Sequence, residues 1–250
     1  IEYLDRLISD QGSGVDLPAG VIVETIQAEG GINVAEREWL LGLQALCRKY
    51  DMLLIIDDIQ VGCGRTGSFF SFDDMGLDPD IICLSKSISG YGLPLAITLI
   101  KPEHDIWEPG EHNGTFRGHN LAFVTAKRAL ELFWSNERLQ KQVEAKADLV
   151  GKALRRICNK FPHARGRVKG RGLLQGIEFE HAELATTASR IAFGKGLIIE
   201  TSGPESQVLK LLPPLTISEQ DLKKGLEIIE HSVGEAIAEL GISRKQAASG

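Results

Sequence analysis

Hydrophobic and polar positions along the first part of the chain alternate between strand-like and helix-like periods. Short apolar runs at residues 21–23, 52–56, 81–84 and 95–100 predict strands. The run at 52–56 is apolar throughout, as in a strand that is buried on both faces of a parallel sheet. Between the first two runs, residues 37–50 have the period of an amphipathic helix. Its apolar face comprises Trp39, Leu40, Leu43, Leu46 and Cys47. This order of elements predicts an α/β layered architecture.

The second half of the chain is predominantly helical in pattern. Helical periodicity begins at His119 and continues, with brief interruptions, to about residue 161, where Pro162 ends it. Beyond it we expect short strands within residues 168–179, a helix at 182–194, strands at 197–199 and 208–209, and a closing helix. Ser218 is the expected N-cap of that last helix, which ends near Leu240. We therefore expect residues 1–138 to form part of a large α/β domain, and residues 139–250 a linking helix and a small α+β domain.

Composition narrows the class of protein. The 250 residues are 43% hydrophobic and 25% charged, with a formal net charge of −6, as in an ordinary globular protein. This excludes disordered, collagen-like and disulfide-scaffold classes, and argues against a nucleic-acid or membrane partner. The four cysteines are scattered without a C-x-x-C pair, so we expect no metal site and a reduced, cytoplasmic location.

The first candidate site follows the strand predicted at residues 52–56. That strand runs into Asp57 and Asp58, and a Gly-rich segment follows at residues 62–67. Open α/β sheets bind ligands at the carboxyl ends of their strands, so an acid here is a candidate ligand-binding group. The same spacing also fits a purely structural role, in which the strand ends in two acids before a Gly-rich turn and binds no ligand. A metal site is the weaker alternative, because no histidine lies at ligand spacing nearby.

The second candidate is Lys86, which follows the strand predicted at residues 81–84. Ser85, Ser87 and Gly90 surround it in the sequence. Lysines avoid protein interiors, so a lysine that a strand delivers into a tight turn either reaches solvent or is reactive. A desolvated lysine can form a Schiff base with an aldehyde, although a surface lysine is the commoner outcome.

The third candidate is the polar segment at residues 110–120, which contains Gly114 and Thr115. Hydroxyl and backbone N–H groups at such a turn can hold a phosphate, and an ordinary loop before a helix fits equally well. Spacing links the three candidates, because Lys86 follows Asp57 by 29 positions and Thr115 follows Lys86 by another 29. Together these groups predict a pyridoxal phosphate site. The carboxylate would keep the pyridine nitrogen protonated, the lysine would bind the aldehyde, and the turn would hold the phosphate.

Four sequence segments resemble the class III pyridoxal-phosphate-dependent aminotransferases. They are residues 24–31 (ETIQAEGG), 57–60 (DDIQ) with 64–67 (GRTG), 79–86 (PDIICLSK) and 114–115 (GT), in the order and spacing of that family. The resemblance covers essentially the whole chain. It implies the fold-type-I α/β architecture, an aminotransferase acting on amino acids and oxo acids, and a homodimer or higher homo-oligomer with active sites at the subunit interface.

The resemblance also implies roles for individual residues. Lys86 corresponds to the lysine that forms the Schiff base and carries the proton. Asp57 corresponds to the partner of the pyridine nitrogen, and Gln60 to the group that hydrogen-bonds the phenolic oxygen. Thr115 corresponds to the residue that reaches the cofactor phosphate of the neighbouring subunit.

Two further residues are implied to bind substrate. Glu29 matches a switch glutamate, which in several family members pairs with a carboxyl-terminal arginine that binds the α-carboxylate of glutamate. The sequence departs from the family here, because the position before the Leu-Leu-Pro-Pro segment is Lys210. Lysine keeps the charge but loses the bidentate fork of arginine, which leaves open how the substrate carboxylate is held.

Residues 87–94, 107–118 and 200–203, together with Lys210, are most similar to the branch of the family that makes diaminobutyrate for ectoine biosynthesis. That branch moves the amino group of L-glutamate to L-aspartate 4-semialdehyde, giving L-2,4-diaminobutyrate and 2-oxoglutarate. The alternatives are a class III enzyme for ornithine, acetylornithine or 4-aminobutyrate, an aminomutase, or an inactive fragment. We expect the chain to lack a large amino-terminal part of the family, and therefore to have weak or no activity alone.

Overall fold

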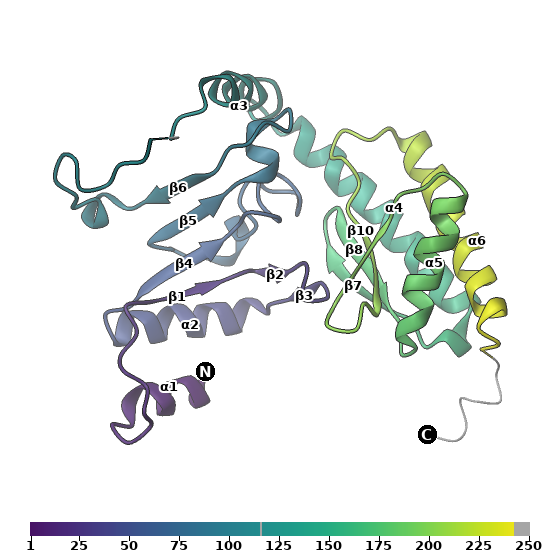
Figure 1. The fold of residues 1–250 in the computed structure, drawn as a ribbon, viewed down its shortest axis with the longest axis horizontal. Helices are drawn as coiled ribbons and strands as arrows, with labels where there is room; N and C mark the ends of the chain where they lie inside the picture. Colours follow the sequence, from purple (N-terminus) through teal and green to yellow (C-terminus); the bar gives the residue numbers. More distant parts are fainter. Residues whose placement is uncertain (116, 243–250) are drawn as a thin grey trace. The chain divides into compact units, whose positions relative to one another are not determined.

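The computed structural model describes residues 1–115 and 117–242, which form two compact units (Figure 1). Unit 1 comprises Ile1–Thr25, Ala35–Cys63 and Ser68–Glu137. Unit 2 comprises Ile26–Val34, Gly64–Gly67 and the chain from Arg138 onward. Two short segments of the first half therefore group with the carboxyl-terminal half.

A four-stranded sheet forms the centre of unit 1. Its order is β1 (Gly20–Val23), β4 (Leu53–Asp57), β5 (Ile81–Leu84) and β6 (Ile97–Ile100). The first three strands are parallel, and β6 runs antiparallel to β5. All four strands lie where the apolar runs predict them, although β4 begins at Leu53 and β6 at Ile97. The predicted mixed α/β architecture is confirmed.

Helix α2 (Arg37–Lys49) packs against β4 and makes the main core of unit 1. Leu40, Leu43, Leu46 and Cys47 are buried there with Leu54 and Ile56 of β4. The prediction was wrong for Trp39, whose side chain is 39% exposed and lies outside this core. By helical spacing, position 39 falls on the same stripe as positions 43 and 46, but Trp39 lies in the first turn of α2, at the end of the stripe.

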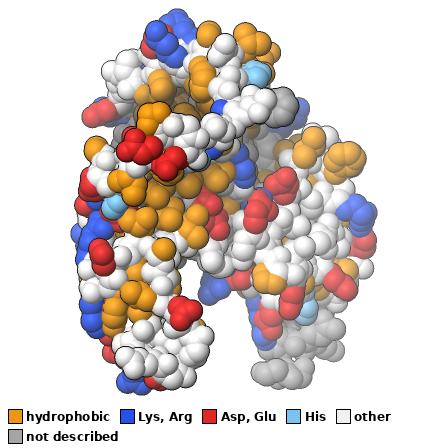
Figure 2. Space-filling view, turned by 60° about the vertical axis from the view of Figure 1, so that its left-hand side comes forward, with side chains coloured by type: hydrophobic (Ala, Val, Ile, Leu, Met, Phe, Trp, Pro, Cys, Tyr) orange, Lys and Arg blue, Asp and Glu red, His pale blue; other side chains and the backbone are white. Residues whose placement is uncertain are grey.

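The other helices of unit 1 are distributed along its sequence. They are α1 (Glu2–Ser9), the short 3-10 helices η1 (Asp73–Met75), η2 (Lys86–Ser89) and η3 (Pro102–His104), and α3 (Asn120–Phe133). The His119 ring caps α3, because its Nδ1 accepts a hydrogen bond from the backbone N–H of Ala122 at 3.0 Å. Hydrophobic side chains also reach the molecular surface, as the orange groups of Figure 2 show.

A second four-stranded sheet forms one side of unit 2 (Figure 1). Its order is β7 (Arg167–Arg171), β8 (Leu174–Glu178), β10 (Val208–Leu211) and β9 (Glu200–Ser202), antiparallel throughout. The short hairpin of β2 (Ile26–Gln27) and β3 (Asn33–Val34) belongs to the same unit.

The strand predicted at residues 197–199 is wrong. The backbone N–H of Leu197 donates to the carbonyl of Ala192 at the end of α5, and the Ser189 hydroxyl donates to the carbonyl of Ile199. These bonds hold the segment against the helix, so the strand β9 starts only at Glu200.

The described part of unit 2 has three α-helices, α4 (Arg138–Lys160), α5 (Ala182–Gly194) and α6 (Glu219–Glu239), with the 3-10 helix η4 (Pro162–Ala164) after α4. Helices α4 and α5 pack on the sheet, and α6 packs on α5 and α4. The long helical pattern from His119 is thus two helices, α3 and α4. The Ser218 hydroxyl accepts from the N–H of Asp221 at 3.0 Å, which confirms the predicted N-cap of α6. Within the described parts of the chain, no helix is long and apolar enough to span a bilayer.

Candidate functional site

Asp57 and Lys86 lie at the same edge of the sheet in unit 1. Asp57 is the last residue of β4, and its Cα partner on the parallel strand β5 is Cys83. Lys86 follows Cys83 by three residues, just beyond the end of β5. Because parallel strands end at a common edge, the carboxyl ends of β4 and β5 bring the acid and the lysine to one place.

The two neighbouring acids at the end of β4 have different environments. Asp58 is 1% exposed, and its Oδ2 accepts a hydrogen bond from the backbone N–H of Ser71 at 3.1 Å. Asp57 is half-buried, and its Oδ1 accepts from the N–H of Ile59 at 3.0 Å. Asp58 therefore holds the following loop, and Asp57 is the acid that a ligand can reach.

The Lys86 side chain is exposed, and its backbone conformation is unusual. Its φ of 49° is in the left-handed region, which costs free energy for any residue with a Cβ atom. The turn around it is fixed, since Ser85 Oγ donates to the carbonyl of Leu95 and Ser89 Oγ accepts from the N–H of Gly92. Strained positions of this kind concentrate at functional sites.

Gly90 ends the same turn and allows α3 to approach it. Its φ is +73°, and a Cβ atom there would lie 2.4 Å from the Cβ of Ala129. Only glycine fits this place without displacing α3. The turn that carries Lys86 is therefore held between β5 and a helix.

The remaining predicted cofactor residues of unit 1 lie in loops. Gln60 is half-buried in the turn that follows β4. Thr115 is exposed in the segment before α3, and the neighbouring Phe116 lies outside the described residues. That segment is organised by the stacking of Trp107 on His112, whose ring centroids are 5.0 Å apart.

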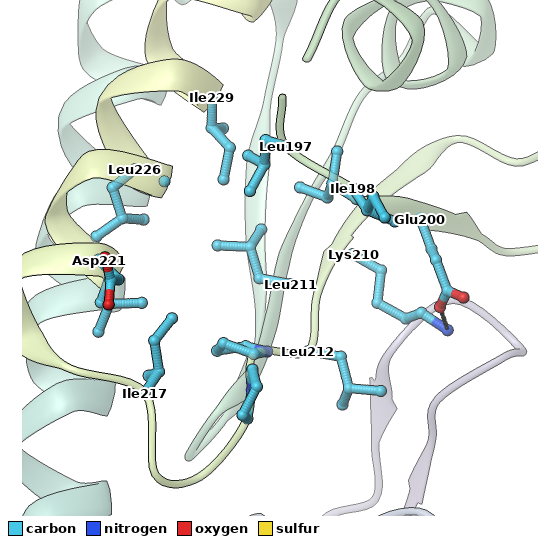
Figure 3. A pocket seen from close by; sticks show the side chains of 15 residues that line it. Leu197, Ile198, Glu200, Lys210, Leu211, Leu212, Ile217, Asp221, Leu226 and Ile229 are labelled. Carbon is cyan, nitrogen blue, oxygen red and sulfur yellow. Dashed lines mark ion pairs between the residues drawn. The ribbon is translucent and has the colours of Figure 1, made fainter. Parts of the chain in front are cut away.

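Glu29 and Lys210, the two predicted substrate-binding residues, are in direct contact in unit 2. The Lys210 ammonium donates to Glu29 Oε1 at 2.7 Å, and it also lies 3.0 Å from Glu200 Oε2 (Figure 3). Burial alone would lower the pKa of Lys210, but the hydrogen bonds from its ammonium to Glu29 and Glu200 outweigh that effect and raise it. Glu200 lies in residues 200–203, one of the segments on which the similarity to one branch of the family rests, but no site role was predicted for it.

Arg65 of the GRTG segment is a second residue to which no role was assigned from the sequence. It is 7% exposed, and its Nη1 donates to the carbonyls of Leu173 and Pro213. Burial lowers the pKa of the Arg65 guanidinium to about 10. Pro213 follows Lys210 by three residues, so Arg65 fixes the chain just beyond the strand that carries Lys210.

The predicted site residues thus fall into two groups. Asp57, Gln60, Lys86 and Thr115 belong to unit 1, whereas Glu29 and Lys210 belong to unit 2. In the portions of the chain that the structure describes, no cluster of three or more His, Cys, Asp or Glu side chains can hold a metal ion.

Comparison with known proteins agrees with this placement of an acid and a lysine at neighbouring carboxyl ends of a parallel sheet. Residues 1–233 match the class-III aminotransferase family, and the chain belongs to that family, whose members depend on pyridoxal phosphate. The chain is 55% identical over 240 residues to the diaminobutyrate–2-oxoglutarate transaminase of Bordetella parapertussis, covering 96% of this chain and 55% of that protein. It is also 55% identical over 239 residues to the transaminase of the same name from Sporosarcina pasteurii, covering 95% of this chain and 56% of that protein.

Solved structures confirm the fold-type-I architecture. The N-acetylornithine aminotransferase of Stenotrophomonas maltophilia superposes with a TM-score of 0.78 at 30% identity, covering 88% of this chain and 57% of that one. The chain spans about half the length of the curated relatives that it matches.

Proposed function

We propose that the protein carrying this chain transfers the amino group of L-glutamate to L-aspartate 4-semialdehyde, giving L-2,4-diaminobutyrate and 2-oxoglutarate for ectoine biosynthesis. The observation that carries an aminotransferase function is the placement of Asp57 and Lys86 at adjoining parallel strand ends. The choice of substrates is supported by 55% identity to proteins named diaminobutyrate–2-oxoglutarate transaminases.

The residues of unit 1 fit pyridoxal phosphate by their chemistry. When bound, the cofactor supplies a ring that accepts the electrons left behind when a proton leaves the substrate carbon. An exposed lysine and a half-buried carboxylate at one sheet edge are the two groups that this chemistry needs. The strained turn that presents Lys86 supports the same assignment, because strain of this kind is retained where function requires it.

Each residue has a defined task in this proposal. Lys86 Nζ would hold the cofactor covalently until the substrate amine displaces it, and the freed lysine amine would then take the proton from the carbon that bears the amino group and deliver it to the cofactor carbon. The Asp57 carboxylate holds the proton on the pyridine nitrogen, and Gln60 hydrogen-bonds the phenolic oxygen. Thr115 holds the cofactor phosphate of a partner subunit.

The exposed apolar surface of α3 supports the proposed homodimer. Leu121, Phe123 and Val124 are 68%, 48% and 66% exposed, and Ile106 in the preceding segment is 79% exposed. Exposed large apolar side chains that gather on one helix are typical of an interaction site. The free cysteines Cys47, Cys63, Cys83 and Cys158 support a reduced, cytoplasmic location.

A panel of amino acceptors tests the proposed function. The protein is saturated with pyridoxal phosphate and supplied with L-glutamate, and the product of each acceptor is quantified. Aspartate 4-semialdehyde is expected to give a higher kcat/KM than the semialdehydes derived from ornithine, acetylornithine and 4-aminobutyrate. A higher kcat/KM with any of those three would reassign the enzyme within its family.

A further inference from the structure

Lys210 is enclosed to a degree that is rare for a lysine. Its side chain is 1% exposed, and among the residues that the structure describes it is the largest fully buried side chain. It belongs to β10, a central strand with β8 on one side and β9 on the other. A buried ammonium is tolerated only with close partners of opposite charge, and Glu29 and Glu200 provide them at 2.7 and 3.0 Å.

The two glutamates are themselves largely open to solvent. Their side chains are 68% and 65% exposed. Figure 3 shows the Glu200 carboxylate directed at the Lys210 ammonium. A molecule that approaches this place therefore meets carboxylate oxygens first, and it reaches the ammonium only after a glutamate has moved.

The two glutamates are anchored differently. Glu200 is the direct cross-strand partner of Lys210 in the β9–β10 ladder, so the strand pairing fixes their backbones opposite each other. Glu29 lies in the turn between β2 and β3, where its backbone carbonyl accepts from the N–H of Gly203 at 2.9 Å. The ladder keeps the backbone of Glu200 opposite Lys210, so Glu200 remains a partner of the ammonium when the Glu29 side chain moves.

We propose that Glu200 is a specificity-determining residue, which weakens the binding of any substrate that brings a carboxylate to Lys210. This inference rests on the proposed function for the substrates involved. Glutamate carries a carboxylate on the carbon that bears its reacting amino group. The terminal carbon of diaminobutyrate carries none, so that substrate leaves both ion pairs of Lys210 in place.

The physical cause is competition for one ammonium. When Glu29 moves away, the Glu200 carboxylate still neutralises Lys210, so an incoming carboxylate binds to a neutral pair and not to a free cation. A substrate without that carboxylate is not subject to the competition. Glu200 therefore weakens the binding of glutamate relative to that of diaminobutyrate. It acts through Lys210 and does not touch the reacting atoms.

The test uses Glu200→Gln, which keeps the shape of the side chain and removes its charge. The probe is glutarate, a dicarboxylate that has no amino group and cannot react, and its binding is measured by calorimetry. Because a partly exposed ion pair contributes modestly, we expect Glu200→Gln to bind glutarate about fivefold more tightly than the wild type. Glu205→Gln is the matched control, because Glu205 is an exposed glutamate on the same segment that makes no ion pair with Lys210.

Steady-state kinetics give a second readout. The KM for glutamate is expected to fall about fivefold in Glu200→Gln, whereas the KM for diaminobutyrate in the reverse direction stays within about twofold. Glu200→Asp keeps the charge and is expected to bind glutarate within about twofold of the wild type. A purely structural role for Glu200 would change both KM values together.

Each outcome decides the inference. Equal glutarate binding by the wild type and Glu200→Gln, including undetectable binding by both, would overturn it. Equal tightening in Glu205→Gln would do the same, because the effect would then be one of general surface charge. If the acceptor panel selects another substrate while Glu200→Gln still tightens glutarate binding, the proposed function fails and this inference stands.

Discussion

Arg48 of α2 and Asp80, which precedes β5, form an ion pair that joins the helix to the sheet of unit 1. Arg48 Nη1 lies 2.9 and 2.8 Å from the two carboxylate oxygens of Asp80, and the backbone N–H of Leu54 donates to the same carboxylate at 2.8 Å. Burial alone would raise the pKa of Asp80. The hydrogen bonds from Leu54 and Arg48 outweigh it and lower that pKa to about 2.

This pair predicts the acid stability of the protein. The folded pKa of Asp80 lies below its ordinary value of 3.8, so its contribution is present above about pH 4 and is lost as the pH falls through about 2. Asp80→Asn is expected to lower the free energy of unfolding at neutral pH by about 2 kcal/mol and to flatten its dependence on pH between about 2 and 4. Urea unfolding at a series of pH values measures both effects. Asp74→Asn, at an exposed acid on η1, is the control, and an equal loss there would contradict the account.

Replacing Gly172 or Gly194 by alanine is expected to change the free energy of unfolding in opposite directions. A Cβ atom at Gly172 would lie 2.3 Å from the carbonyl oxygen of Arg65, and its φ is +60°. Gly172→Ala is therefore expected to lower the free energy of unfolding by about 2–4 kcal/mol. Gly194, at the end of α5, has open space at its Cβ position, so Gly194→Ala is expected to raise stability by up to about 1 kcal/mol. Thermal unfolding of both variants checks the prediction, which fails if the two shifts have the same sign.

The two adjacent acids at the end of β4 predict separate losses of function and of stability. Asp57→Asn keeps the hydrogen bond from the N–H of Ile59 but loses the charge opposite the pyridine nitrogen. We expect its kcat to fall about a hundredfold, with a melting temperature within about 2 °C of the wild type. Asp58→Ala leaves the buried N–H of Ser71 without its acceptor, and is expected to lower stability by about 1–3 kcal/mol. Melting curves and initial rates of both variants distinguish the roles, and an unstable Asp57→Asn would count against them.

The cysteines predict low reactivity in the folded protein. Burial and the nearby charge of Asp58 raise the pKa of the Cys63 thiol to about 12, so almost no thiolate is present at neutral pH. Iodoacetamide at pH 8 is expected to leave Cys63 unlabelled in the folded state and to label it in urea, as peptide mass spectrometry would show. Rapid labelling of Cys63 before unfolding would contradict this environment.

The sheet of unit 1 and its two central site residues could be predicted from the sequence. The apolar runs became the parallel strands β4 and β5. The expectation that residues 52–56 are buried on both faces was wrong, because buried and half-buried side chains alternate along β4. Parallel strands end at one edge, so Asp57 and Lys86 lie at the same edge once the order of the strands is fixed. The left-handed backbone of Lys86 could not be predicted, because nothing in its residue type indicates a positive φ.

The pairing of Lys210 with Glu200 depends on strand register, which the sequence does not specify locally. A shift of one residue in the β9–β10 pairing would place the two side chains on opposite faces. Arg65 was missed for a similar reason, since its acceptors Leu173 and Pro213 are more than 100 residues away in the sequence. The role of Thr115 stays a prediction, because it concerns the cofactor of a second subunit.

Reductive trapping of the cofactor tests the central claim, that Lys86 is the residue to which pyridoxal phosphate binds covalently. The protein is incubated with pyridoxal phosphate and reduced with borohydride, and the modified peptides are identified by mass spectrometry. We expect the label on Lys86, its loss in Lys86→Ala, and its retention in Lys127→Ala, which removes an exposed lysine of α3 whose side chain is 79% exposed. A label spread over Lys127 and other surface lysines, or one that persists in Lys86→Ala, would contradict the account.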